Sequence, residues 1–297
     1  MFVLSQAMLY SALCASGALA PPADSVNWKA VDSLVGRPSV VQPGDVHRFN
    51  FPRSDLHVTV AGVSIKPAFA LGGWVAMTAV TGGVVAMGDL VLTEDEITPV
   101  IKRLQQGGVE QTAIHHHLLR ESPRVYYMHV HAQGDAMKIA PTLRDAIGLT
   151  KAPAPSPAAP AAAIDLDTTA VAKALGYAGR VNGGVYQVSV PRAEPIMEHG
   201  MQIPPSMGLA TAINFQPTGG GKAAITGDFV LNGDEVNPVI RALTSHGIEA
   251  VSIHSHLLEE SPRLFFMHFW ANDDATKLAT GLRAALDATN SQKPVTR

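Results

Sequence analysis

The chain has 297 residues, of which 46% are hydrophobic and 16% are charged, a composition too apolar for a mainly disordered protein. Its net charge of −3, the lack of a basic block and its 6% aromatic content argue against nucleic acid as a partner. The one cysteine, Cys14, lies in an N-terminal apolar stretch, so disulfides and cysteine nucleophiles are not expected in the rest of the chain.

Residues 1–20 have the character of a secretory signal peptide: they are apolar, rich in small residues and end in Ala18-Leu19-Ala20. The usual basic residue is missing before Lys29, and Leu13 stands before Cys14, where a lipoprotein signal needs a small residue. We therefore expect a periplasmic or secreted protein without a lipid anchor, and no transmembrane segment in the mature chain. A retained anchor, or a mis-assigned start codon on a cytosolic protein, is the alternative.

The rest of the chain divides into two similar modules, residues 28–149 and 165–288, which align at a constant offset of 139. Residues 114–132 and 253–271 are identical at 12 of 19 positions and share His-x-His-Leu-Leu, Glu-Ser-Pro-Arg and Met-His. This identity indicates a tandem duplication. Residues 150–164, rich in Pro and Ala, are predicted to be an extended linker, and residues 289–297 a flexible tail.

Each module has the same predicted order of elements. A short helix (28–35; 168–175) precedes three strands, at 47–51, 70–79 and 84–92 in the first module and at 185–190, 210–215 and 223–231 in the second. A helix then begins after Thr93, which has capping-box spacing to Glu96, and after Asn232 in the second module. A strand pair, 109–117 and 125–132, and a helix at 135–147 complete the first module. This order predicts an α+β fold, with helices on one face of a mainly antiparallel sheet.

The histidines of the strand pair are the main functional candidates. Side chains two residues apart on a strand share a face, so His115 and His117 point the same way. His129 and His131 likewise share a face. A hairpin centred on Pro123 places His117 opposite His129, and the same register places His115 opposite His131. Opposite Cβ atoms are only ~4.5–5.5 Å apart, so four imidazoles would have the spacing that one metal ion needs.

The second module repeats this pattern with one change. His254, His256 and His268 correspond to the first three histidines, but Trp270 stands in place of His131. Three imidazoles with an open position are typical of catalytic or exchangeable metal sites. Imidazole suits several transition metals, so the cofactor expected at either site is Zn or Cu, and the sequence does not choose between them.

Acidic residues near the histidines are candidates for supporting roles. Glu121 and Glu260 lie four residues after the second histidine of each His-x-His pair, so each is a candidate fourth ligand or catalytic general base. Asp89 and Asp228 follow a glycine inside a predicted strand, where aspartate is uncommon. Each either orients a metal-bound histidine from outside the ligand set or serves a turn, with the two roles equally favoured.

Arg124 and Arg263 end the connection between the two histidine strands. Arginine at such a position can hold a carboxylate or phosphate with two parallel hydrogen bonds. The favoured interpretation is structural, in which each arginine pairs with Glu121 or Glu260 or binds loop carbonyls.

Three interpretations of the histidines remain open. They bind a divalent transition metal, they line a pocket for an organic ligand in a non-enzymatic envelope protein, or they form a hydrogen-bonded polar core. His116 faces away from its neighbours and has Ser255 as its counterpart, so it is discounted. Histidines without a histidine counterpart are expected at the surface: His47, His57, His199 and His246. The sequence identifies no reaction, substrate or oligomeric state.

The segment 88–96 (Gly-Asp-Leu-Val-Leu-Thr-Glu-Asp-Glu), the two His-x-His-Leu-Leu motifs, and the Glu-Ser-Pro-Arg and Met-His segments resemble the LppY/LpqO-type family of bacterial exported and lipid-anchored proteins. The resemblance covers residues 28–149 and 165–288. It implies an envelope or secreted location and a two-copy architecture, and it transfers no catalytic residue. One departure is His116, where the family pattern has asparagine.

Overall fold

The computed structural model describes residues 25–155 and 163–294. The predicted signal peptide at 1–20 and part of the predicted linker lie outside these residues. The described residues form two α+β modules with mainly antiparallel sheets, as predicted. Within the described ranges, no helix is both long enough and apolar enough to cross a membrane.

The first module is a six-stranded antiparallel sheet in the order β1-β2-β5-β6-β9-β7. Its strands are β1 (Val40–Gln42), β2 (Val46–Pro52), β5 (Gly72–Val80), β6 (Gly83–Leu92), β7 (Glu110–His115) and β9 (Tyr126–Gly134). Three helices, α1 (Trp28–Val35), α3 (Glu94–Gln106) and α4 (Ala136–Ile147), cover one face. The duplicated β6–α3 segment therefore leads from the centre of the sheet to its helical layer.

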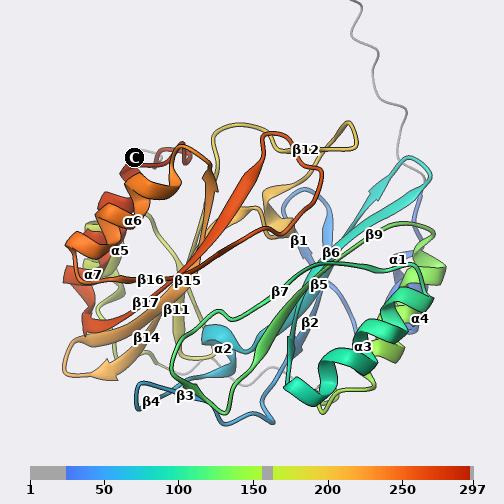
Figure 1. The fold of residues 1–297 in the computed structure, drawn as a ribbon, viewed down its shortest axis with the longest axis horizontal. Helices are drawn as coiled ribbons and strands as arrows, with labels where there is room; N and C mark the ends of the chain where they lie inside the picture. The colour runs from blue at the N-terminus through green and yellow to red at the C-terminus, as the bar shows by residue number, and fades with distance from the viewer. Residues whose placement is uncertain (1–24, 156–162, 295–297) are drawn as a thin grey trace, which may run out of the picture.

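The second module repeats this sheet in the order β10-β11-β14-β15-β17-β16. Its strands are β10 (Arg180–Asn182), β11 (Val185–Pro191), β14 (Ala210–Gly219), β15 (Lys222–Asn232), β16 (Glu249–His254) and β17 (Leu264–Asp274). Its helices are α5 (Thr168–Leu175), α6 (Val236–Ser245) and α7 (Ala275–Asp287). Figure 1 shows the helices at the two outer ends of the molecule and the sheets between them.

Strand alternation gives each sheet an apolar face for its helices. In the first module Val75 and Met77 on β5, and Leu90 on β6, pack with Ile139 and Leu143 of α4 in one buried cluster. The second module has an equivalent cluster with residues from the matching elements. The helices therefore occupy one face of each sheet, which leaves the other faces toward the middle of the molecule.

Each inner face is covered by an arm from the other module. The first module's arm contains β3 (Thr59–Val60), β4 (Val63–Ser64) and α2 (Pro67–Ala70), and its strands form a small sheet with β8 (Glu121–Ser122). The arm is fixed to the second module because Nδ2 of Asn214 donates to the carbonyl of Phe69 at 3.1 Å. Nε2 of Gln187 donates to the carbonyl of Ala68 at 2.8 Å. These arm elements were not predicted from the sequence.

The second module's arm contains β12 (Met197–Glu198), β13 (Met201–Gln202) and the 3-10 helix η1 (Pro205–Met207). Its residues Ile203 and Met207 are buried in one cluster with Ala76 and Met87 of the first sheet. Ser206 Oγ donates to the carbonyl of Pro43 at 2.6 Å. The exchange of arms joins the modules through two shared apolar clusters, one on each side.

A buried arginine connects strand and helix in both modules. Arg53, after β2, donates to Glu96 Oε2 at 2.7 Å and to the carbonyl of Val91 at 2.8 Å. Glu96 also accepts from the backbone N–H of Thr93 at 2.9 Å, so the predicted capping-box contact of Glu96 is present at the start of α3. Arg192 and Glu235 repeat the pair in the second module, with Nη1 to Oε2 at 2.6 Å.

Two expectations about the surface were wrong. His47 is buried, because its ring stacks on Trp28 with centroids 3.7 Å apart and Nδ1 lies 3.0 Å from Ser39 Oγ. The predicted flexible tail at 289–297 is packed over its first residues, since Thr289 and Ser291 are buried. The backbone N–H of Asn290 donates to Glu235 Oε1 at 2.6 Å, which fixes this segment to the arginine pair of the second module.

Candidate metal centre

The register expected for the histidine hairpin was wrong. His115 lies opposite Tyr127, not opposite His131, and Ala113 lies opposite His129. Two features cause the difference: the connecting residues 116–125 contain β8, which pairs with β3, and the ladder is irregular between Gln111 and Ala113. His117 consequently lies beyond the end of β7, in the connection.

Histidines of both modules meet in one cluster instead of forming two separate sites. Its members, here called the histidine cluster, are His115, His117, His129, His254, His256 and His268. The rings of His115 and His254 stack with centroids 3.7 Å apart. His117 and His268 are 3.8 Å apart, and His129 and His256 repeat this distance of 3.8 Å. The pairs exchange under the duplication, so the cluster has approximate two-fold symmetry.

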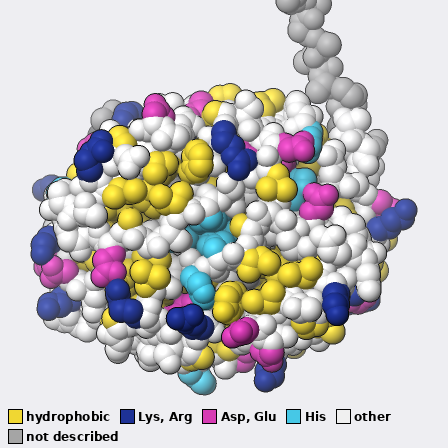
Figure 2. Space-filling model, in the orientation of Figure 1, with side chains coloured by type: hydrophobic (Ala, Val, Ile, Leu, Met, Phe, Trp, Pro, Cys, Tyr) yellow, Lys and Arg dark blue, Asp and Glu magenta, His cyan; other side chains and the backbone are white. Residues whose placement is uncertain are grey.

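The cluster forms where edge strands β7 and β16 approach each other. Ser252 Oγ donates to the carbonyl of His116 at 3.1 Å, and Arg120 pairs with Glu249 at 2.7 Å across the same boundary. Figure 2 shows histidine side chains near the middle of this face, with apolar patches on both sides. Cross-module contacts of this kind depend on packing between modules, which no local sequence pattern encodes.

Two aspartates adjoin the cluster directly. Asp89 on β6 lies opposite His129 on β9, and Asp228 on β15 lies opposite His268 on β17. Oδ2 of Asp228 is 3.0 Å from Nε2 of His256. Oδ2 of Asp89 is 3.6 Å from Nε2 of His117. The sequence assigned both aspartates to orienting or turn roles, but the structure places their carboxylates among the imidazole nitrogens.

Several ligand sets in the cluster have metal-binding spacing. Atoms within 4.8 Å of one another occur in four groups: His115, His117 and His268; His115, His129 and His254; Asp89, His117 and His129; Asp228, His254 and His256. In the last group, Nε2 of His254 is 3.0 Å from Nε2 of His256. Ligands at about 2.0–2.1 Å in a tetrahedron around zinc lie roughly 3.3 Å apart, so this separation is close to that of a zinc site.

Buried ring nitrogens of the cluster lack hydrogen-bond partners among the described residues. They are Nε2 of His115, His117, His129 and His268 and Nδ1 of His254, together with Oδ1 of Asp89 and of Asp228. Each such atom costs roughly 1–3 kcal/mol when it is left unsatisfied. Nδ1 of His268 lies 2.7 Å from the carbonyl of Gly227, which can only accept. Its proton is therefore on Nδ1, and the lone pair of Nε2 points into the cluster.

Burial favours the neutral form of five of the cluster histidines. It lowers the pKa of His115 to about 3, and it also lowers the pKa of His117, His129, His254 and His268. Burial, and then the charge of Asp228, raise the pKa of Asp89 well above its usual range. Burial also raises the pKa of Asp228, but the interactions of its carboxylate with His268 and His256 outweigh this effect and lower the pKa overall. Neutral imidazole is the form that binds a metal.

His131 and Trp270 lie outside the cluster. Nε2 of His131 is 3.0 Å from Oε2 of Glu198 on β12, in the arm of the second module. Trp270 packs edge-on against Phe69 of the opposite arm, with centroids 6.1 Å apart. His131 is therefore not a fourth imidazole of the cluster, and Trp270 does not stand beside an open metal site. Each side chain faces an arm instead.

Glu121 and Glu260 contact the chain outside the cluster. Oε1 of Glu121 lies 2.9 Å from Nδ1 of His116 and accepts from the N–H of Val125. Glu260 accepts from the N–H of Leu264 at 2.8 Å and pairs with Arg263 at 3.2 Å. Both carboxylates thus stabilise the connection between the two histidine strands.

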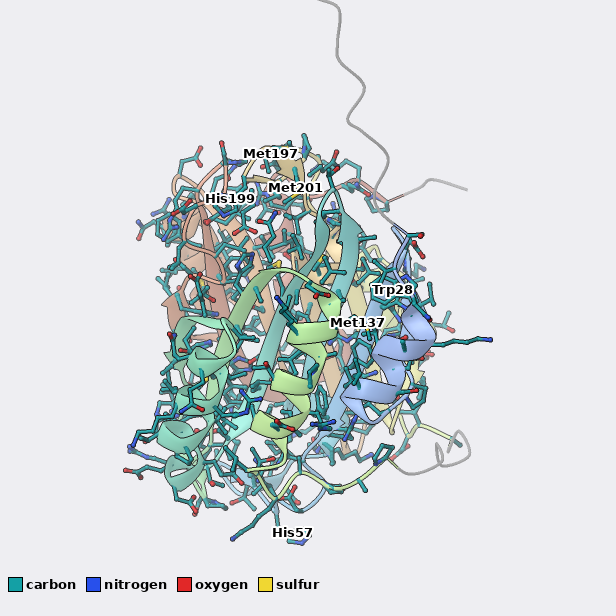
Figure 3. All side chains as sticks on the ribbon, turned by 90° about the vertical axis from the view of Figure 1, so that its right-hand side faces the viewer. Trp28, His57, Met137, Met197, His199 and Met201 are labelled. Atoms are coloured by element: carbon teal, nitrogen blue, oxygen red, sulfur yellow. The ribbon has the colours of Figure 1, made fainter. Side chains whose placement is uncertain are left out.

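The arginines of that connection are exposed. Nη1 of Arg263 also donates to the carbonyl of Leu258 at 3.1 Å, which is the structural role favoured from the sequence. Arg124 is exposed on the same loop of the first module. Two histidines without counterparts are also exposed: Figure 3 shows His57 and His199 at opposite ends of the molecule.

A cavity of about 840 Å³ lies between the modules and reaches the cluster. Four of the cluster histidines and both aspartates line it, as do Arg48, Trp74 and Arg180. This volume is within the range of about 300–1,000 Å³ that holds small organic molecules. The sequence did not single out Arg48 or Arg180, because neither residue recurs in the other module and neither lies in a motif.

The comparisons identify a family but no activity. A family model described as Domain of Unknown Function (DUF1259) matches residues 29–148 and again residues 169–288. A search of curated proteins found no match. Among solved structures, the trimeric bacterial microcompartment shell protein PduB aligns with 85% of this chain and 91% of its own, at 11% identity and a TM-score of 0.22, which is too low for any inference. The narrower LppY/LpqO name stays a prediction. Since the two matches span most of the chain, the protein belongs to the DUF1259 family and contains two tandem copies of its domain.

Proposed function

We propose that the protein binds a divalent transition metal, zinc or copper, in one centre shared by its two modules. The ligands would come from the histidine cluster and from Asp89 and Asp228. This differs from the arrangement expected from the sequence, in which each module had its own site and His131 belonged to the first. The observation that carries the proposal is the set of buried, partnerless ring nitrogens that converge from both modules.

The chemistry of the ligand set supports this proposal. Six imidazoles with two carboxylates exceed the four ligands that one zinc ion takes, so the cluster has enough donors for two ions. Nδ1 of His268 is bound to a backbone carbonyl, a contact that fixes metal-binding histidines in the correct orientation. A hydrogen-bonded polar core explains the cluster less well, because its hydrogen-bonding capacity is left unused at seven atoms.

The cavity supports a role beyond storage. A metal held by Asp89, His117 and His129 would face the cavity, since all three residues line it. Such a metal can polarise a bound substrate or activate water for hydrolysis. The organic-ligand pocket considered from the sequence is therefore compatible with the metal centre, because the cavity and the cluster adjoin. We also propose export to the periplasm, on the character of residues 1–20.

The direct experiment is metal analysis of untagged protein after loading with zinc or copper. We expect at least one ion per chain in the parent protein. His117→Ala and His256→Ala, which remove equivalent ligands from the two modules, should each lower the metal content. A parent chain that stays essentially metal-free after loading would contradict the proposal.

The duplication supplies a matched control. His116 lies between two cluster histidines in sequence, but its ring contacts Glu121 outside the cluster. The second module has Ser255 at this position, so the fold accepts serine there. His116→Ser should therefore bind as much metal as the parent. If removal of any histidine lowered the metal content, His116→Ser would lose as much metal as the two cluster variants.

A further inference from the structure

The wall of the cavity is not symmetric, although the histidine cluster is. Arg48 on β2 corresponds to Gln187 on β11. Arg180 on β10 corresponds to Val40 on β1, because these two residues pair with the same position of the neighbouring strand. The two guanidinium groups therefore come from different strands of different modules, yet both line the cavity. Duplication alone does not create such a pair.

Neither arginine is neutralised by an ion pair. Within the part of the chain that the structure describes, no carboxylate lies within 4.0 Å of the guanidinium nitrogens of Arg48 or Arg180. By contrast, the fully buried Arg53 and Arg192 each contact two carboxylates. Arg48 is half-buried and Arg180 is exposed. An arginine that faces a cavity without a carboxylate presents its planar donor fork to whatever enters the cavity.

The position of Arg48 is fixed by its own module. Its guanidinium lies over the Trp74 ring at 4.0 Å from the centroid, and Nε donates to Oδ1 of Asn50 at 3.2 Å. These contacts leave both Nη groups without a hydrogen-bond partner among the described residues. Burial lowers the pKa of Arg48 to about 10, and the charge of Arg180 lowers it too, while Asp89 opposes the shift. The side chain stays charged at neutral pH, and two positive charges interact across the cavity.

We propose that the cavity binds a small organic anion whose carboxylate or phosphate group is held by Arg48 and Arg180. The rest of the molecule would extend along Trp74 toward Asp89 and the histidine cluster. The contacts of the two arginines with the anion need no metal. The proposal rests on the proposed metal centre only where the anion is taken to be a substrate of that centre. An anion is favoured since it would relieve the repulsion between two cations and use the free donors of both.

Binding is tested on metal-free protein, so that contacts to a metal do not contribute. Phenyl phosphate and benzoate serve as anionic probes for the two acid groups, and benzyl alcohol serves as the neutral analogue, all by isothermal titration. We expect at least one anion to bind about tenfold or more tightly than benzyl alcohol, since charge-assisted hydrogen bonds have this magnitude. The stronger of the two anions identifies the acid group that the site prefers.

The variants are supplied by the other module. Arg48→Gln and Arg180→Val place at each position the residue that its counterpart has, and each should weaken anion binding about tenfold. Lys173→Gln changes the net charge equally on an exposed site of α5 and should leave binding unchanged. The anion site would be overturned if benzyl alcohol bound as tightly as the anions. It would also be overturned if neither arginine variant bound the anions more weakly than the parent. Zinc content, measured in parallel, should not change in either arginine variant. If the parent takes up no zinc but binds anions, and the arginine variants bind them more weakly, only the metal centre is overturned.

Discussion

At the scale of single residues, the properties of the cluster follow from burial of groups that normally meet water. Imidazole has a usual pKa near 6.5, and burial disfavours its charged form. The five cluster histidines with a lowered pKa are therefore neutral in the folded protein and free to bind a metal through a lone pair. Asp228, whose pKa is lowered, supplies negative charge that favours a divalent ion.

This burial predicts acid sensitivity of the metal-free protein. The histidines bind protons at about pH 6.5 when unfolded but only at lower pH when folded, so the unfolded chain carries more protons below pH 6.5. The free energy of unfolding must then fall as the pH decreases from about 6.5, by roughly 1 kcal/mol per pH unit for His115 alone. The raised pKa of Asp89 acts in the opposite direction but is a single group.

Urea unfolding of the metal-free protein at about pH 7.5 and about pH 5 measures this effect, with the unperturbed histidine pKa between the two conditions. His57→Gln is the control, because His57 is exposed and outside the cluster, and it should leave the pH dependence unchanged. Equal stability at the two pH values would show that the cluster histidines are not held neutral by burial.

At the scale of elements, the strands that carry the aspartates approach their neighbours closely. An alanine Cβ at Gly227 would lie 1.9 Å from the carbonyl oxygen of Ala212, and at Gly88 it would lie 2.7 Å from that of Trp74. Glycine is therefore required before each aspartate by the spacing of β5 with β6 and of β14 with β15. The carbonyl of Gly227 also orients the ring of His268, a proposed metal ligand. The close approach of the strands and the orientation of that ring therefore both depend on Gly227.

We predict that Gly227→Ala destabilises the protein by about 1–3 kcal/mol, the usual range for overpacking, and also reduces its metal content. The matched control is Gly72→Ala on β5, where the nearest atom to a Cβ is the carbonyl oxygen of Pro67 at 3.6 Å. The second module has Ala210 at the equivalent strand position. If both variants had the same stability and metal content as the parent, the close approach would not matter.

The order of the main elements could be predicted from the sequence because each has a local signal. A nearly continuous apolar run indicates strand β6, and Thr93 with Glu96 indicates the start of α3. The register of β7 could not be predicted, because it depends on β8, and β8 pairs with an arm that carries no strong strand pattern. The wrong register placed His131 in the predicted site, although its ring contacts Glu198, and it hid the direct contact of Asp89 with the cluster.

At the scale of the whole molecule, the duplication creates a centre that neither module has alone. Within the histidine cluster, each ring pair at 3.7–3.8 Å joins a histidine of one module to a histidine of the other. The exchanged arms hold the two sheets in this position through clusters that contain residues of both modules. Sequence repetition predicted one site in each module, with Trp270 in place of His131 in the second, but it contains no information on how the copies pack. The shared centre could therefore only be seen in the folded chain.

The metal centre that we propose lies between the modules and takes ligands from both. Anomalous diffraction from crystals of the zinc-loaded full chain, measured on both sides of the zinc absorption edge, tests it directly. We expect a peak within bonding distance, about 2.0–2.2 Å, of ligands from both modules. Zinc peaks bound by one module alone, or no peak among the histidines of the cluster, would contradict it.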